Sequence, residues 1–90
     1  MYQLKLFIAG HTLRSQRAIE NLKYLFEEKL TNNYELVIID VLKEPALAEA
    51  AKILATPTLI RELPSPVRRI IGDLSEHEKV LIGLEIQGDL

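Results

Sequence analysis

The chain has 90 residues, a net charge of −2, 48% hydrophobic residues and no cysteine. This length predicts one domain spanning residues 1–90, which buries roughly 60–65% of its unfolded surface. The lack of cysteine excludes disulfides, thiol catalysis and thiolate metal sites, and the slightly acidic balance gives no electrostatic basis for binding nucleic acid. No apolar run approaches the ~20 residues of a membrane span, and the N-terminus lacks the features of a signal peptide. We therefore expect a soluble, cytoplasmic protein.

The first forty residues predict a strand, a helix and a second strand. Residues 2–9 alternate, with Leu4, Leu6 and Ile8 on one side, as in a strand with one apolar face. Residues 17–30 carry apolar side chains at helical spacing, and Ser15 is expected to cap that helix. Residues 36–39 are all apolar, which favours a central strand covered on both faces. Together these elements predict a parallel, right-handed β-α-β unit.

The next segment is framed by prolines. Pro45 suits the first turn of a short helix over residues 46–54. Beyond it, residues 58–60 and 67–71 form two short apolar runs that we expect to be strands. Because proline fixes its own backbone angle and favours extended geometry in the preceding residue, a stiff turn should join them. The prolines of this segment are Pro57, Pro64 and Pro66.

The last segment, residues 75–86, matches two patterns. Ser75 and Glu78 have the spacing of a capping box, which predicts a helix start. A helix places Val80, Leu81 and Leu84 on one face, whereas a strand places Val80, Ile82, Leu84 and Ile86 on one face. We predict a helix, with the strand as its competitor.

The sum is an α/β protein with the thioredoxin-like order β-α-β-α-β-β-α. In that fold the residue before the third strand is commonly a cis-proline, and Thr56-Pro57 holds that place. Enzymes of this fold carry a nucleophile in the loop before the first helix, where this chain has Gly10–Ser15 and no thiol. Ser15 leaves a glutathione-binding hydroxyl as an alternative, although a helix cap is the simpler interpretation.

Other chemistry is sparse. Asp40 ends a predicted strand without an evident partner base, and two isolated histidines, His11 and His77, make a poor metal site. We predict no catalytic residue, no bound metal and no cofactor. A sequence cluster of Arg61, Arg68 and Arg69 has two interpretations: ordinary solvated charge on a strand, or a patch for an acidic protein partner.

Several blocks of the sequence resemble the KaiB family of circadian clock proteins. They cover nearly the whole chain, and the two between residues 52 and 84 are the most specific. The blocks are Leu4-Lys-Leu-Phe-Ile-Ala-Gly10, Ile39-Asp-Val-Leu-Lys43, Lys52-Ile-Leu-Ala-Thr-Pro-Thr-Leu59, Pro66-Val-Arg-Arg-Ile-Ile-Gly-Asp-Leu-Ser75 and Glu78-Lys-Val-Leu-Ile-Gly-Leu84.

The resemblance implies a non-enzymatic clock adaptor that interconverts two folds. One is thioredoxin-like and monomeric, and binds the first ATPase ring of the KaiC hexamer. In the other, the KaiB ground-state fold, the C-terminal half is rearranged, the last segment becomes a strand, and subunits form a tetramer or dimer. The family's complex modulates the KaiC phosphorylation cycle, captures KaiA and displaces a sensor kinase with a KaiB-like domain.

The resemblance also implies roles for particular residues. Lys52 matches a residue that faces KaiC, and three basic positions match residues tied to complex formation: Arg17, Arg61 and Arg68, with Arg61 standing where lysine is usual. Five further positions match residues that differ between the folds or tip their balance: Gly83, Glu85, Pro57, Pro64 and Pro66.

The chain also departs from the family pattern. Ala50-Ala51 stands where members carry an acidic pair, and Glu35 and Val37 replace residues of the strand edge linked to KaiA capture. These departures leave an alternative function open: a thioredoxin-fold interaction module of a kinase or stress-response pathway without a KaiA partner.

Overall fold

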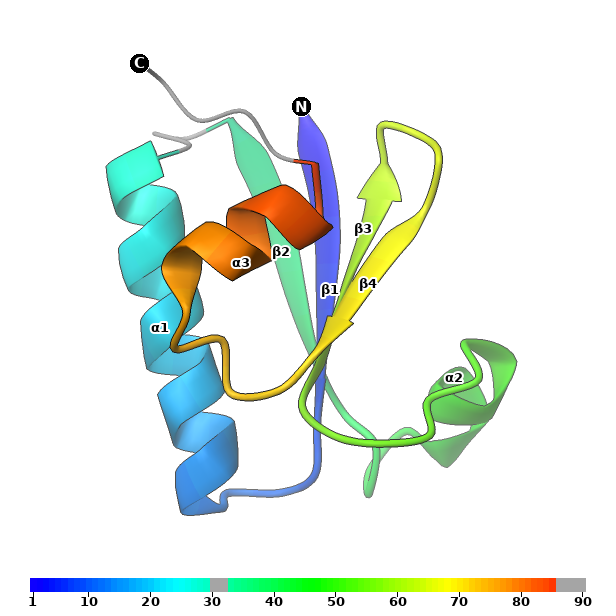
Figure 1. Ribbon diagram of the computed structural model, residues 1–90. Helices are drawn as coiled ribbons and strands as arrows, with labels where there is room; N and C mark the ends of the chain where they lie inside the picture. The colour runs from blue at the N-terminus through cyan, green and yellow to red at the C-terminus, as the bar shows by residue number, and fades with distance from the viewer. Residues whose placement is uncertain (30–32, 86–90) are drawn as a thin grey trace.

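The computed structural model describes residues 1–29 and 33–85, and these contain the predicted order of elements (Figure 1). The strands form one sheet in the order β2-β1-β3-β4, in which β1 and β2 are parallel and the other pairs antiparallel. The thioredoxin-like fold class is therefore confirmed. The elements are β1 (Tyr2–Ile8), α1 (Leu13–Lys29), β2 (Tyr34–Asp40), α2 (Pro45–Ala50), β3 (Thr58–Leu63), β4 (Arg68–Ile71) and α3 (His77–Gly83).

The main core lies between the sheet and two helices. α1 runs roughly along the strands and α3 crosses them, both on one face of the sheet (Figure 1). Each fully buried leucine or phenylalanine here contributes about 1.5–3 kcal/mol of transfer free energy. The buried residues of this core are Leu4, Leu6, Ile8, Ala18, Leu22, Leu25, Phe26, Leu59, Leu74, Val80 and Leu84.

A smaller core lies on the opposite face, beneath the chain that follows α2. Its buried residues are Phe7, Ile39 and Ile60, and Ala51 and Ile53 pack against them. Phe7 alternates with Leu6 along β1, so β1 is apolar on both faces, where the sequence pattern had suggested one apolar face.

The prediction that residues 36–39 belong to a central strand covered on both faces is wrong. β2 lies at the edge of the sheet, and Val37 and Ile38 are 52% and 39% exposed. An unbroken apolar run shows that both faces are apolar, but it does not show how much of each is covered. The neighbouring helices do not cover β2 fully, so it keeps an exposed apolar side chain on each face, Val37 on one and Ile38 on the other.

Three predicted helix boundaries need correction. Thr12, and not Ser15, caps α1, because its hydroxyl accepts the Ser15 N–H at 3.1 Å. α2 ends at Ala50 instead of residue 54, because the backbone of Lys52 is left-handed at φ 55°. The capping box at Ser75 does not form, since Glu76 is the N-cap of α3 and has no side-chain cap.

The last segment adopts the predicted helix over residues 77–83, with Val80 buried. Ile86, which would extend the competing strand, lies outside the described residues. Within residues 1–29 and 33–85, no helix is both long and apolar enough to cross a bilayer.

Candidate functional site

Arg61 links the end of α3 to the turn before β4. Only 3% of this residue is exposed. Its Nη1 donates to the carbonyl oxygens of Leu84 at 2.6 Å and Glu85 at 3.3 Å, and its Nη2 donates to that of Pro66 at 2.6 Å. The planar guanidinium presents its donors as a fixed fork, which suits two acceptors in separate segments. One side chain therefore holds two pieces of the C-terminal half together.

Glu85 lies at the point where this network reaches the surface. Its backbone is left-handed at φ 54°, directly after the α3 cap residue Leu84. Its carboxylate oxygen Oε1 lies 3.2 Å from Nη2 of Arg68, with both side chains about half exposed. The structure thus brings together Arg61 and Arg68, two predicted partner-binding residues, with Glu85, a predicted fold-switch residue.

The three neighbouring arginines do not form one surface cluster. Arg61 pairs with Arg68 across β3 and β4, so both point to the α3 side, whereas Arg69 points to the α2 side. Arg61 is also buried among carbonyls, so its guanidinium is not on the surface in this fold. Sequence proximity suggested a patch, but strand alternation separates its members.

Lys52 lies on the opposite face from Arg61, exposed at the end of α2. Arg69 supports this end: its Nη2 donates to the carbonyl of Ala51 at 2.9 Å and its Nη1 to that of Lys52 at 3.3 Å. Sequence reasoning missed this role of Arg69. Alternation along β4 could have placed it on the α2 face, but only the structure shows the carbonyls within reach.

Gly83 ends α3 in close contact with β4. A Cβ atom at this position would lie 2.5 Å from Cδ1 and 3.0 Å from Cγ1 of Ile70. Helix propensity alone favours alanine here, so the close packing opposes the intrinsic preference.

The three prolines assigned to switching lie at both ends of β3. Pro57 is buried just before the strand, and Pro64 and Pro66 are exposed in the turn that follows it. The Thr56-Pro57 bond is cis, as is common at this place in the fold, and Leu63-Pro64 and Ser65-Pro66 are also cis.

Arg17 stands apart from the other assigned residues. It is exposed on α1 and borders a shallow depression with Arg14 and Asp73. The hydroxyl and N–H of Ser75, which hydrogen-bond the Asp73 carboxylate, lower the pKa of Asp73, and the two arginines lower it further. Ser75 does not cap α3, because its N–H bonds Asp73 and Glu76 occupies the cap position.

The loop before α1 is held by hydrogen bonds within the fold. Ser15 is 3% exposed and its hydroxyl oxygen accepts a bond from the Thr12 hydroxyl at 3.0 Å, so it is not presented to a ligand such as glutathione. Asp40 accepts the N–H groups of Gly10 and Leu42 at 3.0 and 2.9 Å, which lowers the pKa of its carboxyl. These contacts give both residues structural roles.

The histidines belong to no metal cluster within the described chain, where no three His, Asp or Glu side chains are placed to hold an ion. The ring of His77 instead lies 5.5 Å from that of Tyr24, centroid to centroid, where α3 meets α1.

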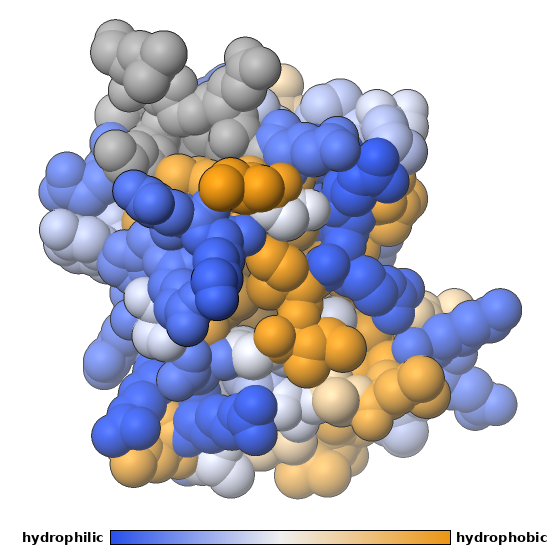
Figure 2. All heavy atoms as spheres, in the orientation of Figure 1, coloured by the Kyte–Doolittle hydropathy of each residue, from blue (hydrophilic) through white to orange (hydrophobic). Residues whose placement is uncertain are grey.

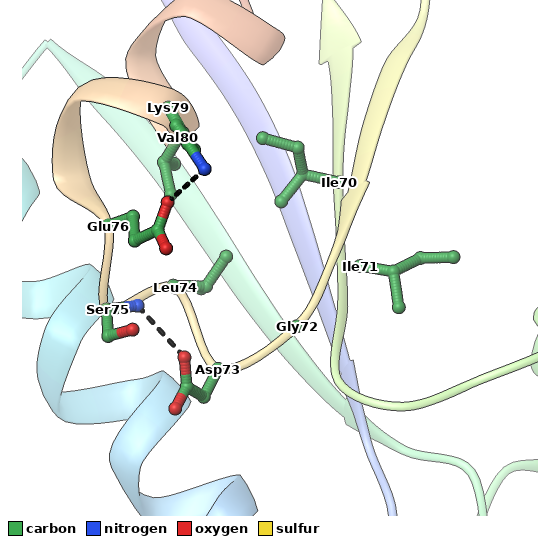
Figure 3. Close-up of a pocket in the computed structure, with 9 residues that line it drawn as sticks. All are labelled: Ile70, Ile71, Gly72, Asp73, Leu74, Ser75, Glu76, Lys79 and Val80. Atoms are coloured by element: carbon green, nitrogen blue, oxygen red, sulfur yellow. Dashed lines mark hydrogen bonds and ion pairs between the residues drawn. The ribbon is translucent and has the colours of Figure 1, made fainter.

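A pocket of about 330 Å³ lies between β4 and the start of α3 (Figure 3). Ile70 and Val80 line it with apolar groups. Its polar groups bond to each other: Lys79 to Glu76 at 2.7 Å, and Ser75 to Asp73 at 3.1 Å. The Glu76 carboxylate raises the pKa of Lys79 accordingly. Because these groups bond to each other, we interpret the pocket as part of the packing interface between α3 and the sheet, and not as a ligand site.

The face of the molecule drawn in Figure 2 carries a band of apolar side chains between charged ones. Figure 2 shows apolar side chains gathered between α3 and β4 and again over α2. Three of the largely exposed apolar residues from these segments and the loop after α2 are Ile71 at 59%, Ile82 at 75% and Leu54 at 95%. Contact surface, and not a reactive group, is what this face offers.

The fold and the candidate site define a thioredoxin-like α/β protein without the thiol pair of thioredoxins. Mitochondrial thioredoxin 3 from Saccharomyces cerevisiae, in its oxidized form, matches with a TM-score of 0.75 and 19% identity, covering 93% of this chain and 76% of its own. The N-terminal domain of Synechococcus elongatus SasA matches with a TM-score of 0.76 and 22% identity, covering 99% of this chain and 88% of its own. At these identities the likeness concerns the fold.

The sequence places the chain more narrowly: residues 5–86 match the KaiB domain, and the chain belongs to the KaiB family. It is 60% identical to the circadian clock oscillator protein KaiB of Microcystis aeruginosa over 85 residues, 94% of this chain and 82% of the relative. It is 59% identical over 88 residues to the protein of the same name from Prochlorococcus marinus, covering 98% and 82%.

Proposed function

We propose that this chain is a single-domain, non-enzymatic, cytoplasmic clock adaptor that binds the first ATPase ring of a KaiC-type hexamer and modulates its phosphorylation cycle. The observation that carries the proposal is 60% identity, over 94% of the chain, to a circadian clock oscillator protein KaiB. The thioredoxin-like arrangement adds support, because it is the fold that the family resemblance associates with KaiC binding.

The docking end of this proposal is the exposed Lys52 at the end of α2. Its backbone carbonyl accepts a hydrogen bond from Arg69, and its side chain is exposed, where the ammonium can meet an acidic surface. Arg68 and Arg17 add positive charge elsewhere. Arg61 contributes indirectly in this fold, by holding α3 in place.

Mixing the chain with a KaiC hexamer and following size exclusion over many hours tests this proposal. Co-elution is the expected result, and Lys52→Glu should abolish it by reversing the charge. Lys23→Glu is the matched control, because Lys23 is exposed on α1, away from α2. No co-elution of the wild type at any time or phosphorylation state would remove the proposal.

We propose further that the C-terminal half switches between two folds. The residues assigned to this switch are Gly83, Glu85, Pro57, Pro64 and Pro66. α3 has seven residues, too few for a helix to be stable by itself in water. It therefore depends on contacts with the sheet and α1, and losing those contacts frees the segment to form the competing strand. The rearranged form would self-associate as a tetramer or dimer.

Two further partners belong to the proposal. KaiA capture would use the β2 edge, where Glu35 and Val37 are exposed. Competition with a KaiB-like sensor kinase domain agrees with the shared fold of the SasA N-terminal domain. Titrating KaiA into a preformed complex tests the first, since binding should be lost when Val37→Asp places a charge on that edge.

The alternative function is a thioredoxin-fold interaction module of a kinase or stress-response pathway, favoured by the missing acidic pair at Ala50-Ala51. The structure sharpens its test. Ala51 packs against the Phe7 core, so a charge there would disturb the fold, whereas Ala50 is exposed. If Ala50→Glu strengthens KaiC binding, the clock adaptor is favoured; an unchanged affinity would leave the alternative standing.

A further inference from the structure

The two short helices end in the same way. In each, the cap residue, Ala51 or Leu84, is followed by a left-handed residue, Lys52 at φ 55° or Glu85 at φ 54°. The last carbonyls of a helix have no partner within it and carry its partial negative charge. In each case an arginine from the β3–β4 hairpin donates to the carbonyls of the cap residue and of the left-handed residue.

The two arginines lie on adjacent strands and reach in opposite directions. Arg61 of β3 pairs with Arg68, and Arg69 of β4 pairs with Ile60, so successive side chains leave opposite faces of one hairpin. Arg61 reaches Leu84 and Glu85 of the α3 end on one face. On the other face, Arg69 reaches the α2 end at Ala51 and Lys52.

The two contacts differ in exposure. Arg61 is 3% exposed and also holds the Pro66 carbonyl, so water has little access to replace its bonds. Arg69 is exposed, and its two bonds compete with water. Removing a donor from buried acceptors costs more than removing one from exposed acceptors.

We propose that the β3–β4 hairpin is a double clamp, in which Arg61 latches the end of α3 and Arg69 is a positioning residue for Lys52 at the end of α2. The two halves of the clamp work separately, because each touches only its own helix. The part that concerns Lys52 rests on the proposed docking function, whereas the latch on α3 does not.

Amide hydrogen exchange of the intact chain tests the clamp directly. The amides of Leu84 and Glu85 report on α3, because they donate to Val80 and Ile82, and those of Ala51 and Lys52 report on α2. Arg61→Met should speed exchange at the α3 amides by about tenfold or more and leave the α2 amides within about twofold. Arg69→Met should speed exchange at the α2 amides by about two- to fivefold and leave the α3 amides nearly unchanged.

Arg61→Lys keeps the charge and serves if Arg61→Met fails to fold. One ammonium cannot span acceptors in two segments as the guanidinium does, so exchange at the α3 amides should be faster in Arg61→Lys than in the wild type. Equal exchange in Lys and wild type would overturn the latch. So would either methionine variant that leaves its own helix unchanged or alters both helices equally.

The positioning role is tested by a double-mutant cycle on affinity for the ATPase ring. Arg69→Met should weaken binding severalfold in the wild type and have no further effect in a Lys52→Ala background, because it acts through Lys52. Losses that multiply independently would overturn this role. If the wild type binds no ring, the proposed function fails, while the exchange comparison still decides the clamp.

Discussion

The end of α2 and the end of α3 share one construction but differ in what lies beneath them. α2 has no buried residue, whereas α3 buries Val80 and the cap residue Leu84, and its clamp Arg61 is buried as well. The α2 end is therefore a surface feature whose stability should respond gradually to substitution. The α3 end stands on a few buried contacts, so it should hold or release as a unit.

Leu84 and Ile82 give the largest predicted contrast within α3. Leu84 is fully buried and Ile82 is 75% exposed. Leu84→Ala should lower the free energy of unfolding by about 2–5 kcal/mol, through lost burial and a cavity, whereas Ile82→Ala should change it by no more than about 0.5 kcal/mol. Urea unfolding measures both. Equal effects would mean that α3 does not pack on the sheet as described.

Gly83 and Ile70 give a prediction of about 1 kcal/mol. Gly83→Ala should gain about 1 kcal/mol of helix propensity but force Ile70 from its rotamer at a similar cost of about 0.5–1.5 kcal/mol. The single variant should be nearly neutral. In an Ile70→Val background, which lacks the Cδ1 atom, the gain should appear. If the changes in unfolding free energy of Gly83→Ala and Ile70→Val simply add in the double variant, the predicted contact between residues 83 and 70 is contradicted.

The Arg68–Glu85 ion pair should matter less. Both side chains are partly exposed, so Glu85→Gln should destabilise α3 by under about 1 kcal/mol, and less in high salt. Glu62→Gln is the matched control, since Glu62 pairs with Lys5 at 3.1 Å on the α2 side of the sheet. Exchange at the α3 amides should respond only to Glu85→Gln. A response to both variants would show that the pairs are not local.

Acid should loosen the start of each short helix through a different carboxylate. Asp73 precedes α3 and Asp40 precedes α2, and hydrogen bonds lower the pKa of each. A lowered folded pKa adds stability above the ordinary Asp value of about 3.9, and that stability is lost as pH falls through the folded pKa. Asp73→Asn should flatten the acid dependence of exchange in α3 and leave α2 unchanged. Asp40→Asn should flatten the acid dependence of exchange in α2 and leave α3 unchanged. A variant that flattens the dependence in both helices would refute the assignment.

The sequence predicted the order of elements and the thioredoxin-like class, because hydrophobic periodicity and prolines mark local structure. It did not reveal that β2 is an edge strand, since apolar residues alone do not show which faces are covered. Nor did it reveal that Arg61 is buried. A charged side chain is normally exposed to water, and the backbone carbonyls that surround Arg61 come from other segments of the chain. Ser75 misled for a similar reason: Asp73, two residues away, accepts its N–H, and Glu76 takes the cap position of α3.

Residues 77–83 form a helix that a few contacts hold on the sheet, and we propose that the segment can leave this helical state. NMR chemical shifts of the segment, recorded together with the particle mass in solution, test whether it does. We expect a helical monomer that exchanges with a larger particle in which the segment is extended, and a greater share of the second form in Arg61→Met. One helical form at monomer mass, at every concentration and in both proteins, would contradict it.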